Sequence, residues 1–203
     1  MLVRKELLCM IKDDILKLAS ENNGYIYSEL IKQNNIKTIY ISRLVLEGKL
    51  KKVARGIYIT KDGIEDDLFI LSLQYKKMVY CGETALFLNQ LSNKQFPTYE
   101  AVFPYGYNNK VDRVKMRYTR KESYSIGIDN IKTMFGNLVK SYDKERCICD
   151  LFINPDKYDY EDRVYAINEY KNNYLNFDKL YSYAKQLGVY DEVKNVFEVI
   201  GWN

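Results

Sequence analysis

The sequence of 203 residues contains no histidine and only four cysteines. The absence of histidine removes the usual general base near neutral pH and every Ser-His or Cys-His nucleophile arrangement. It also excludes zinc sites built from cysteine and histidine, and Cys9, Cys81, Cys147 and Cys149 are too scattered for a four-cysteine site. We therefore expect buried thiols, and we predict no enzyme activity, no catalytic residues, no metal site and no cofactor.

Long apolar runs are also missing. No stretch approaches the roughly 18–20 apolar residues that a membrane span needs, and charged residues interrupt the N-terminal segment where a secretory signal would be apolar. The contents of 47% hydrophobic and 29% charged residues are ordinary for a folded protein. We expect a cytoplasmic protein with no membrane partner.

The positive charge is unevenly distributed along the chain. The net charge is only +4, but residues 1–62 hold twelve Lys and Arg against seven Asp and Glu, a net of +5. The remaining 141 residues are close to neutral. A basic excess confined to one part of a chain is typical of a module that binds a polyanion.

Helical patterning divides the beginning of the chain into three segments. Apolar residues recur at helical spacing over residues 4–20, a short helix is expected over 29–33 with Ser28 as N-cap, and a third over 38–47 with Thr38 as N-cap. Gly48 suits the left-handed position just after a helix. In a helix-turn-helix, the N-terminal half of the last helix enters the major groove. We expect five outward residues to face that groove: Lys37, Thr38, Tyr40, Ser42 and Arg43.

A cationic hairpin is predicted directly after the third helix, with Arg55-Gly56 at its turn. Because strict alternation cannot place Leu50 and Val53 on one face, the first strand begins near Lys52 or contains a bulge. Each Lys or Arg that neutralises a phosphate contributes roughly −0.9 to the log–log salt slope. The residues expected to hold the DNA backbone are Lys49, Lys51, Lys52 and Arg55.

Together these elements predict an α+β protein with an N-terminal winged helix-turn-helix domain over residues 1–66. Residues 67–77 are expected to form a connecting helix. They open a C-terminal domain, 67–203, of mixed α/β structure that ends in a helical bundle. Within it, Asp143 and Asn176 are expected to cap helices, and Gly188 is expected to end one.

A second basic segment lies in the C-terminal domain, where residues 110–121 hold six Lys and Arg against one Asp. Alternation over 111–118 predicts a strand with Val114, Met116 and Tyr118 facing inward. The outer face is expected to be either a solvated surface or a contact with DNA, RNA or protein. Its residues are Lys110, Arg113, Lys115, Arg117 and Arg120.

Two other classes of function remain open from the residues. Pro155-Asp156 followed by Glu161-x-Arg163 faintly resembles a PD-(D/E)xK nuclease pattern, although this segment is predicted to be loop and helix rather than paired strands. A carboxylate- and metal-dependent nuclease is therefore the less favoured alternative. A protein-interaction module with a degenerate winged helix is the other.

Three blocks of sequence carry a family resemblance. They are Arg55-Gly56-Ile57-Tyr58, then Gly82-Glu83-Thr84-Ala85-Leu86 with Leu91 and Pro97 beyond it, and finally Tyr142-Asp143-Lys144-Glu145-Arg146 running into Cys149-Asp150. In their order and spacing they resemble the AbiEi family, the antitoxins of type IV toxin–antitoxin systems in abortive phage infection. The likeness covers nearly the whole chain. The family often has a histidine in the Ala-Leu helix, which Leu88-Asn89-Gln90-Leu91 lacks.

The resemblance implies a transcriptional autorepressor that is also an antitoxin. Its winged helix would bind double-stranded DNA at inverted repeats in its own promoter, with two copies on the DNA. Its C-terminal domain would counter a nucleotidyltransferase-like toxin, a functional partner with which it forms no stable complex. No role that depends on the missing histidine carries over to this chain.

Overall fold

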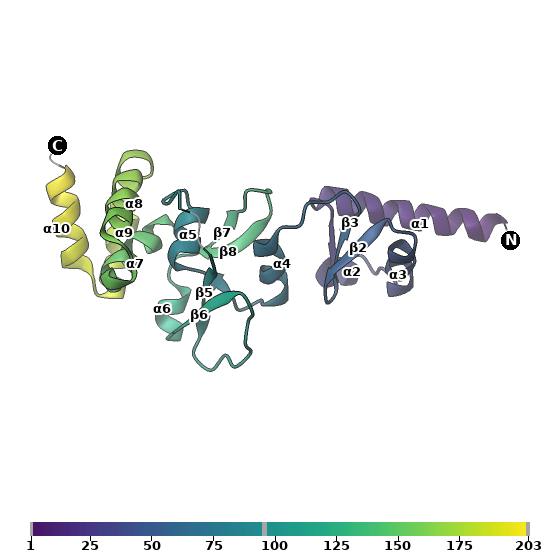
Figure 1. Cartoon of the computed structure of the whole chain (residues 1–203), viewed down its shortest axis with the longest axis horizontal. Helices are drawn as coiled ribbons and strands as arrows, with labels where there is room; N and C mark the ends of the chain where they lie inside the picture. The colour runs from purple at the N-terminus through teal and green to yellow at the C-terminus, as the bar shows by residue number, and fades with distance from the viewer. Residues whose placement is uncertain (1, 95–96, 202–203) are drawn as a thin grey trace. The chain divides into compact units, whose positions relative to one another are not determined.

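The computed structural model describes residues 2–94 and 97–201, and it has two units. The first extends to Lys76 and includes the short segment Thr133–Asn137, and the second comprises Lys77–Lys132 and the chain from Leu138 onward. Helices and strands occur in both units (Figure 1), which confirms a mixed α+β fold. Among the described residues, no helix is both long enough and apolar enough to cross a membrane.

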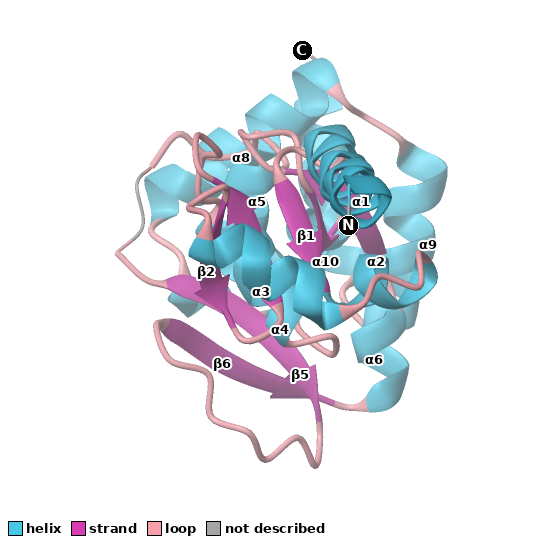
Figure 2. Cartoon of the chain, turned by 90° about the vertical axis from the view of Figure 1, so that its right-hand side faces the viewer, coloured by secondary structure: helices cyan, strands magenta, loops and turns pink. Residues whose placement is uncertain are grey.

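The first unit combines four helices with a small antiparallel sheet among its described residues. Its elements are α1 (Leu2–Glu21), β1 (Tyr25–Tyr27), α2 (Ser28–Gln33), α3 (Thr38–Leu46), β2 (Leu50–Ala54), β3 (Ile57–Thr60) and α4 (Asp67–Gln74). The strand order is β1-β3-β2, so β3 is central and β2 forms an edge. Figure 2 draws the helices α1, α2 and α3 of this unit in cyan.

The sheet of the first unit has a hydrophobic core on each face. On one face Ile26 and Leu50 pack with Ile15 of α1 and with Ile41 and Leu44 of α3. On the other face the apolar side chains, together with Ile70 of α4, are Tyr25, Ile57 and Ile59. This division follows from the period of two along a strand, which sends neighbouring side chains to opposite faces.

Of the two alternatives that the sequence left for the first strand of the hairpin, a start near Lys52 was wrong, because β2 begins at Leu50, and a bulge is present. Lys52 pairs with Tyr58 and Ala54 pairs with Ile57, so the register shifts and Val53 is the extra residue. Because Val53 is left out of the pairing, the residues on either side of it still pair with β3, and Leu50 at the start of β2 is buried.

Helix α4 groups with the first unit, although the sequence placed the boundary after residue 66 and assigned 67–77 to the second domain. Its N-cap, Asp66, is buried and accepts a hydrogen bond from the Phe69 amide at 3.2 Å. The Tyr25 hydroxyl accepts a hydrogen bond from the Asp66 amide at 2.7 Å, and the Phe69 ring packs edge-on against Tyr25. The helix therefore completes the core beneath the sheet.

The second unit is built on a five-stranded mixed sheet of order β6-β5-β4-β8-β7. Its strands are β4 (Val79–Tyr80), β5 (Tyr99–Pro104), β6 (Val114–Thr119), β7 (Ile128–Lys132) and β8 (Leu138–Tyr142). Its helices are α5 (Gly82–Leu88), α6 (Lys121–Ser125), α7 (Lys144–Ile153), η1 (Pro155–Lys157), α8 (Tyr160–Asn173), α9 (Phe177–Leu187) and α10 (Tyr190–Gly201). One core joins the sheet to the helices, with Cys147, Cys149 and Tyr170 among its buried members.

Several predicted caps of the second unit are confirmed. Asp143 accepts a hydrogen bond from the Arg146 amide at 2.9 Å, and Asn176 accepts one from the Lys179 amide at 3.1 Å. Gly188 ends α9 with a φ of 75°. The predictions for Ser28 and Thr38 in the first unit were wrong, because α2 and α3 begin at these residues and the N-cap positions belong to Tyr27 and Lys37.

Candidate nucleic-acid interface

The loop between α2 and α3 sets the direction of α3. It spans residues 34–37, where Asn35 has a positive φ of 52° and the Asn34 side chain donates a hydrogen bond to the Leu30 carbonyl at 2.9 Å. Asparagine tolerates this left-handed conformation better than most residues. The buried Ile41 and Leu44 then fix one side of α3 against the core, leaving its opposite side exposed.

The predicted groove residues all lie on or just before α3. Lys37, Thr38, Ser42 and Arg43 are exposed, whereas Tyr40 is only half-exposed and packs partly against the core. The Ser42 hydroxyl donates a hydrogen bond to the Thr38 carbonyl at 3.2 Å. The hydroxyl proton of Ser42 is therefore already engaged within the helix, so Ser42 cannot donate it to a base edge while this hydrogen bond is intact.

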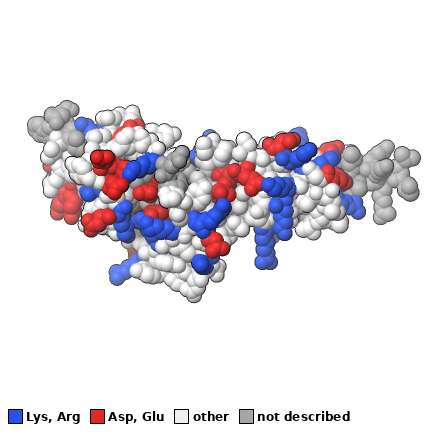
Figure 3. Space-filling model, in the orientation of Figure 1, with Lys and Arg blue, Asp and Glu red and all other residues white. Residues whose placement is uncertain are grey.

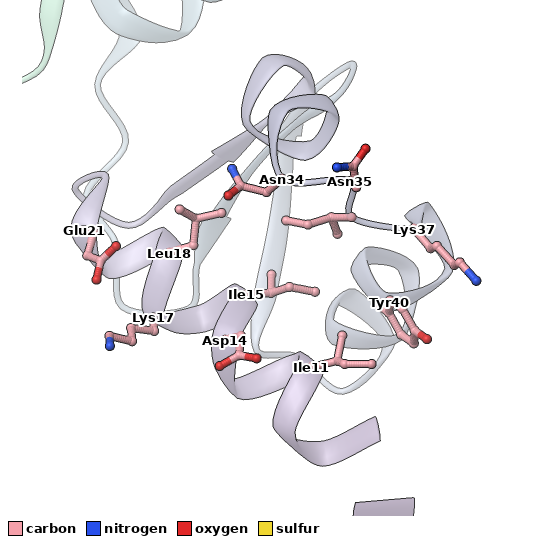
Figure 4. Close-up of a pocket in the computed structure, with 11 residues that line it drawn as sticks. Ile11, Asp14, Ile15, Lys17, Leu18, Glu21, Asn34, Asn35, Lys37 and Tyr40 are labelled. Atoms are coloured by element: carbon pink, nitrogen blue, oxygen red, sulfur yellow. The ribbon is translucent and has the colours of Figure 1, made fainter. Parts of the chain in front are cut away.

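A hollow of about 610 Å³ lies beside the start of α3, within the first unit. Figure 4 shows Ile11, Ile15 and Leu18 of α1 on one side of it and Asn34 and Tyr40 on the other. In the same view the Lys37 side chain extends away from α1. Tyr40 therefore has a packing role at this hollow, while Lys37 remains an outward cation.

At the other end of α3, one carboxylate balances part of the positive charge. Glu47 forms an ion pair with Lys12 of α1. The hydrogen bond from Lys12 lowers the pKa of Glu47, and the nearby charges of Lys49 and Arg43 lower it further. Arg43 and Lys49 are thus exposed cations beside a carboxylate, rather than isolated positive charges.

The two adjacent lysines of β2 point to opposite faces of the sheet. Lys52 lies opposite Tyr58, on the face that also carries Leu50 and packs against α1 and α3. Lys51 lies opposite Ile59, on the α4 face, and forms an ion pair with Glu65. The structure therefore groups Lys52 with α3 and separates Lys51 from it.

Arg55 stands at the exposed turn of the hairpin, next to Gly56. Gly56 has a φ of +70°, and a Cβ there would overlap the Ser28 hydroxyl. The Ser28 hydroxyl instead donates a hydrogen bond to the Gly56 carbonyl at 3.2 Å. The turn is thereby tied to the first residue of α2, which fixes the backbone that carries Arg55.

These contacts leave exposed cations along α3 and on the hairpin that follows it. Figure 3 shows Lys and Arg side chains gathered over the part of the first unit where β2 and β3 lie in Figure 1. Within residues 2–94 and 97–201, Lys37, Lys52 and Arg55 have no ion-pair partner. We call these three residues, together with Arg43 and Lys49, the α3–hairpin surface.

The second basic segment is divided by a buried carboxylate. Glu100 of β5 is 5% exposed and forms ion pairs with both Lys115, at 2.8 Å, and Arg117. Lys110, Arg113 and Arg120 are exposed. Lys115 is exposed as well, although it pairs with Glu100, so Arg117 alone among these five residues departs from the predicted exposure.

The prediction that Arg117 faces solvent opposite an inward Tyr118 was wrong. The Arg117 side chain is only 20% exposed, whereas Tyr118 is 45% exposed. The parallel register pairs Glu100 with Lys115 and Val102 with Arg117, so the basic face of β6 is the face that meets Glu100. A signal was present in the sequence, since Glu100 interrupts an otherwise apolar strand.

The residues of the nuclease alternative are not gathered into a site. Asp156 lies on η1 and Glu161 on α8, both exposed, and no group of three metal-binding side chains occurs among the residues with described positions. Cys81, Cys147 and Cys149 are free and buried, as expected. Burial raises the pKa of the Cys81 thiol to about 12. These thiols are therefore protonated, packed core groups.

Comparisons with known proteins bear on the fold. No protein-family model and no curated protein sequence matches this chain significantly. The Rv2827c protein from Mycobacterium tuberculosis has a similar crystal structure, with a TM-score of 0.55 and 8% sequence identity. The match covers 91% of this chain and 77% of that chain. Over most of its length, the chain is thus similar in fold to Rv2827c.

Proposed function

We propose that the first unit is a winged helix-turn-helix that binds double-stranded DNA. The observation that carries the proposal is the α3–hairpin surface, where a helix with exposed cations and the basic antiparallel hairpin that follows it share one core. The loop over residues 34–37 has the length of helix-turn-helix turns. In this proposal the N-terminal half of α3 enters the major groove, and Lys52 and Arg55 hold the phosphate backbone.

The wider proposal is an autorepressor with antitoxin activity of the AbiEi kind. It is supported by the order of the three sequence blocks and by a two-unit organisation that separates a basic module from a larger one. Two copies would bind inverted repeats in the promoter of the chain's own operon. The second unit would oppose a nucleotidyltransferase-like toxin without a stable complex.

The DNA-binding proposal is tested by fluorescence anisotropy with labelled DNA from upstream of the gene, across a series of salt concentrations. The Lys52→Ala, Arg55→Ala double variant should bind all sequences more weakly and flatten the salt slope by about two units. Arg43→Ala should instead relax sequence preference, at a cost of about 1–3 kcal/mol if Arg43 contacts a base. The same affinity and slope in the double variant as in the parent would exclude the hairpin as a DNA contact.

The antitoxin proposal needs a separate readout. Co-expression with the reading frame adjacent to the gene should restore the growth of cells that this frame alone arrests. The Lys52→Ala, Arg55→Ala variant provides the control, because rescue that survives loss of promoter binding assigns neutralisation to the second unit. A neighbouring frame that is harmless when expressed alone would contradict the antitoxin role.

A further inference from the structure

A polar hollow of about 270 Å³ lies within the second unit, between the end of β6, α7 and η1. Three of its lining residues are cations, namely Arg117 of β6, Arg146 of α7 and Lys157 of η1. One is a carboxylate, Asp150. The polar residues Thr119, Ser123 and Asn154 also line it. We call this space the β6–α7 hollow.

Arg146 is held rigidly at the wall of the hollow. Its Nε atom donates a hydrogen bond to Asp150 at 2.8 Å, and its Nη1 atom donates to the carbonyls of Ser123 and Ile126 at 2.6 and 2.8 Å. Its guanidinium also lies 4.0 Å from the centre of the Tyr142 ring. These contacts use Nε and Nη1, while Nη2 has no hydrogen bond among them. An arginine fixed in this way binds an anion with little loss of side-chain entropy.

Arg117 is oriented by a different carboxylate. One of its terminal nitrogens contacts Glu100, and Glu100 also accepts from Lys115. Glu100 approaches Gly82 so closely that a Cβ at position 82 would overlap its carboxylate. Glu100 therefore fixes the position of the Arg117 side chain without lining the hollow itself.

The charges at the hollow are unequal. Including the supporting residues Glu100 and Lys115, four cations stand against two carboxylates. Burial raises the pKa of Asp150, while Arg146, Arg117 and Lys157 oppose that effect. Even with Asp150 ionised, two positive charges remain uncompensated. A partly enclosed site strengthens their attraction for an anion, because screening by water is weaker there than at the surface.

We propose that the β6–α7 hollow binds the phosphoryl group of a small phosphorylated molecule. A phosphate dianion matches the two excess positive charges, and the planar guanidinium groups suit phosphate oxygens. Lys157, an exposed lysine that lines the hollow, supplies a further positive charge. The volume is below the usual range of about 300–1,000 Å³ for larger ligands, so the site holds a phosphate or a compact organic phosphate. This site is separate from the α3–hairpin surface and does not depend on DNA binding.

The test is a titration of the full chain with inorganic phosphate at constant ionic strength. Isothermal calorimetry measures the affinity, and the NMR signals of the arginine Nε–H groups report which arginines respond. Saturable binding should shift the signals of Arg117 and Arg146. Lys157→Gln should weaken binding about tenfold, the loss expected for one charge-assisted contact at a partly exposed position. Lys140→Gln, which removes an exposed lysine of β8 outside the hollow, should leave binding unchanged.

A ribonucleoside 5′-monophosphate provides a second arm. Tighter binding than inorganic phosphate, with the same loss in Lys157→Gln, assigns the site to an organic phosphate, and weaker binding assigns it to free phosphate. Absence of saturation at 20 mM phosphate, or equal affinity in Lys157→Gln and Lys140→Gln, overturns the proposal. Because the titration contains no DNA, its failure is distinct from any failure of the DNA-binding proposal.

Discussion

The cations of the two units differ in their surroundings. In the first unit, Lys52 and Arg55 are exposed on a hairpin and pair with no carboxylate among the described residues. In the second unit, Arg146 is buried and forms an ion pair with Asp150, and the partly buried Arg117 forms one with Glu100. The hairpin and the segment 110–121, which contains Arg117, are both basic in sequence. The difference teaches that the density of basic residues does not identify a binding surface. The exposure of the cations and the position of the nearest carboxylates decide whether a side chain is free to reach a large partner at the surface or is held in place within the fold.

The largest expected effect is on the free energy of unfolding, and it distinguishes the buried Arg146 from the exposed Arg55. Arg146→Ala should reduce the free energy of unfolding by about 3–5 kcal/mol, because it leaves Asp150 and two backbone carbonyls without their buried partner. Arg55→Ala, the matched exposed variant, should change it by no more than about 0.5 kcal/mol. Urea unfolding measures both values. Similar losses in the two variants would break the comparison.

A pH experiment addresses the core of the second unit. Burial raises the pKa of the Cys81 and Cys149 thiols to about 12, above the value of roughly 8.5 for an exposed thiol. The folded state therefore holds these protons more tightly, so stability is full below about pH 8.5 and falls as the pH rises toward 12. The expected loss is about 1 kcal/mol for each thiol per pH unit.

Urea unfolding between pH 7 and pH 10 checks this slope. Cys149→Ala should lower stability at pH 7, because it removes a buried group, yet it should make the fall above pH 8.5 shallower. An unchanged slope in that variant would show that the thiol does not contribute to the alkaline loss.

A pair of glycines gives the next contrast. Gly82→Ala in the second unit should cost about 2–4 kcal/mol, because φ is +59° and the new Cβ would overlap the buried Glu100 carboxylate. Gly56→Ala in the first unit should cost only about 1–2 kcal/mol, since the overlapping Ser28 hydroxyl can rotate away and mainly the backbone conformation is penalised. Thermal unfolding of both variants measures the difference. A greater loss at Gly56 would contradict it.

The smallest effect sharpens the comparison within the hairpin itself. Lys52→Ala should reduce the salt slope of DNA binding by about one unit, as expected for one phosphate contact. Lys51→Ala should reduce it by less, because Lys51 lies on the opposite face and pairs with Glu65. Anisotropy titrations at several salt concentrations distinguish the two lysines. An equal reduction in both would mean that the ion pair opens on DNA and that both lysines reach the backbone.

Local chemistry made several elements predictable. Asp143, Asn176 and Gly188 act within one turn of helix, so the sequence alone identified their roles. The bulge in β2 was only one of two alternatives from the sequence, and it does not bring Leu50 and Val53 to one face, since Leu50 packs toward α1 and α3 and Val53 toward α4. The mixed α+β class followed from the same patterns.

Long-range pairing explains what the sequence could not supply. Arg117 was assigned to solvent because its own strand alternates cleanly, but its environment is set by Glu100, which a parallel register brings onto the same face. The sequence predicts the same role for Lys51 and Lys52 on the DNA backbone. In the structure they lie on opposite faces of the sheet, and Lys51 pairs with Glu65. Ser28 was read as a cap although its hydroxyl bonds the hairpin turn. In each case the deciding partner is more than ten residues away.

That last contact has a consequence for recognition. A hairpin that is loose in the free protein loses conformational entropy when a ligand orders it, and its affinity falls accordingly. Here the hydrogen bond from Ser28 to the Gly56 carbonyl fastens the turn to the start of α2 before any ligand arrives. The backbone of Arg55 is thus ordered during folding, so the hairpin would lose little further entropy on binding a ligand.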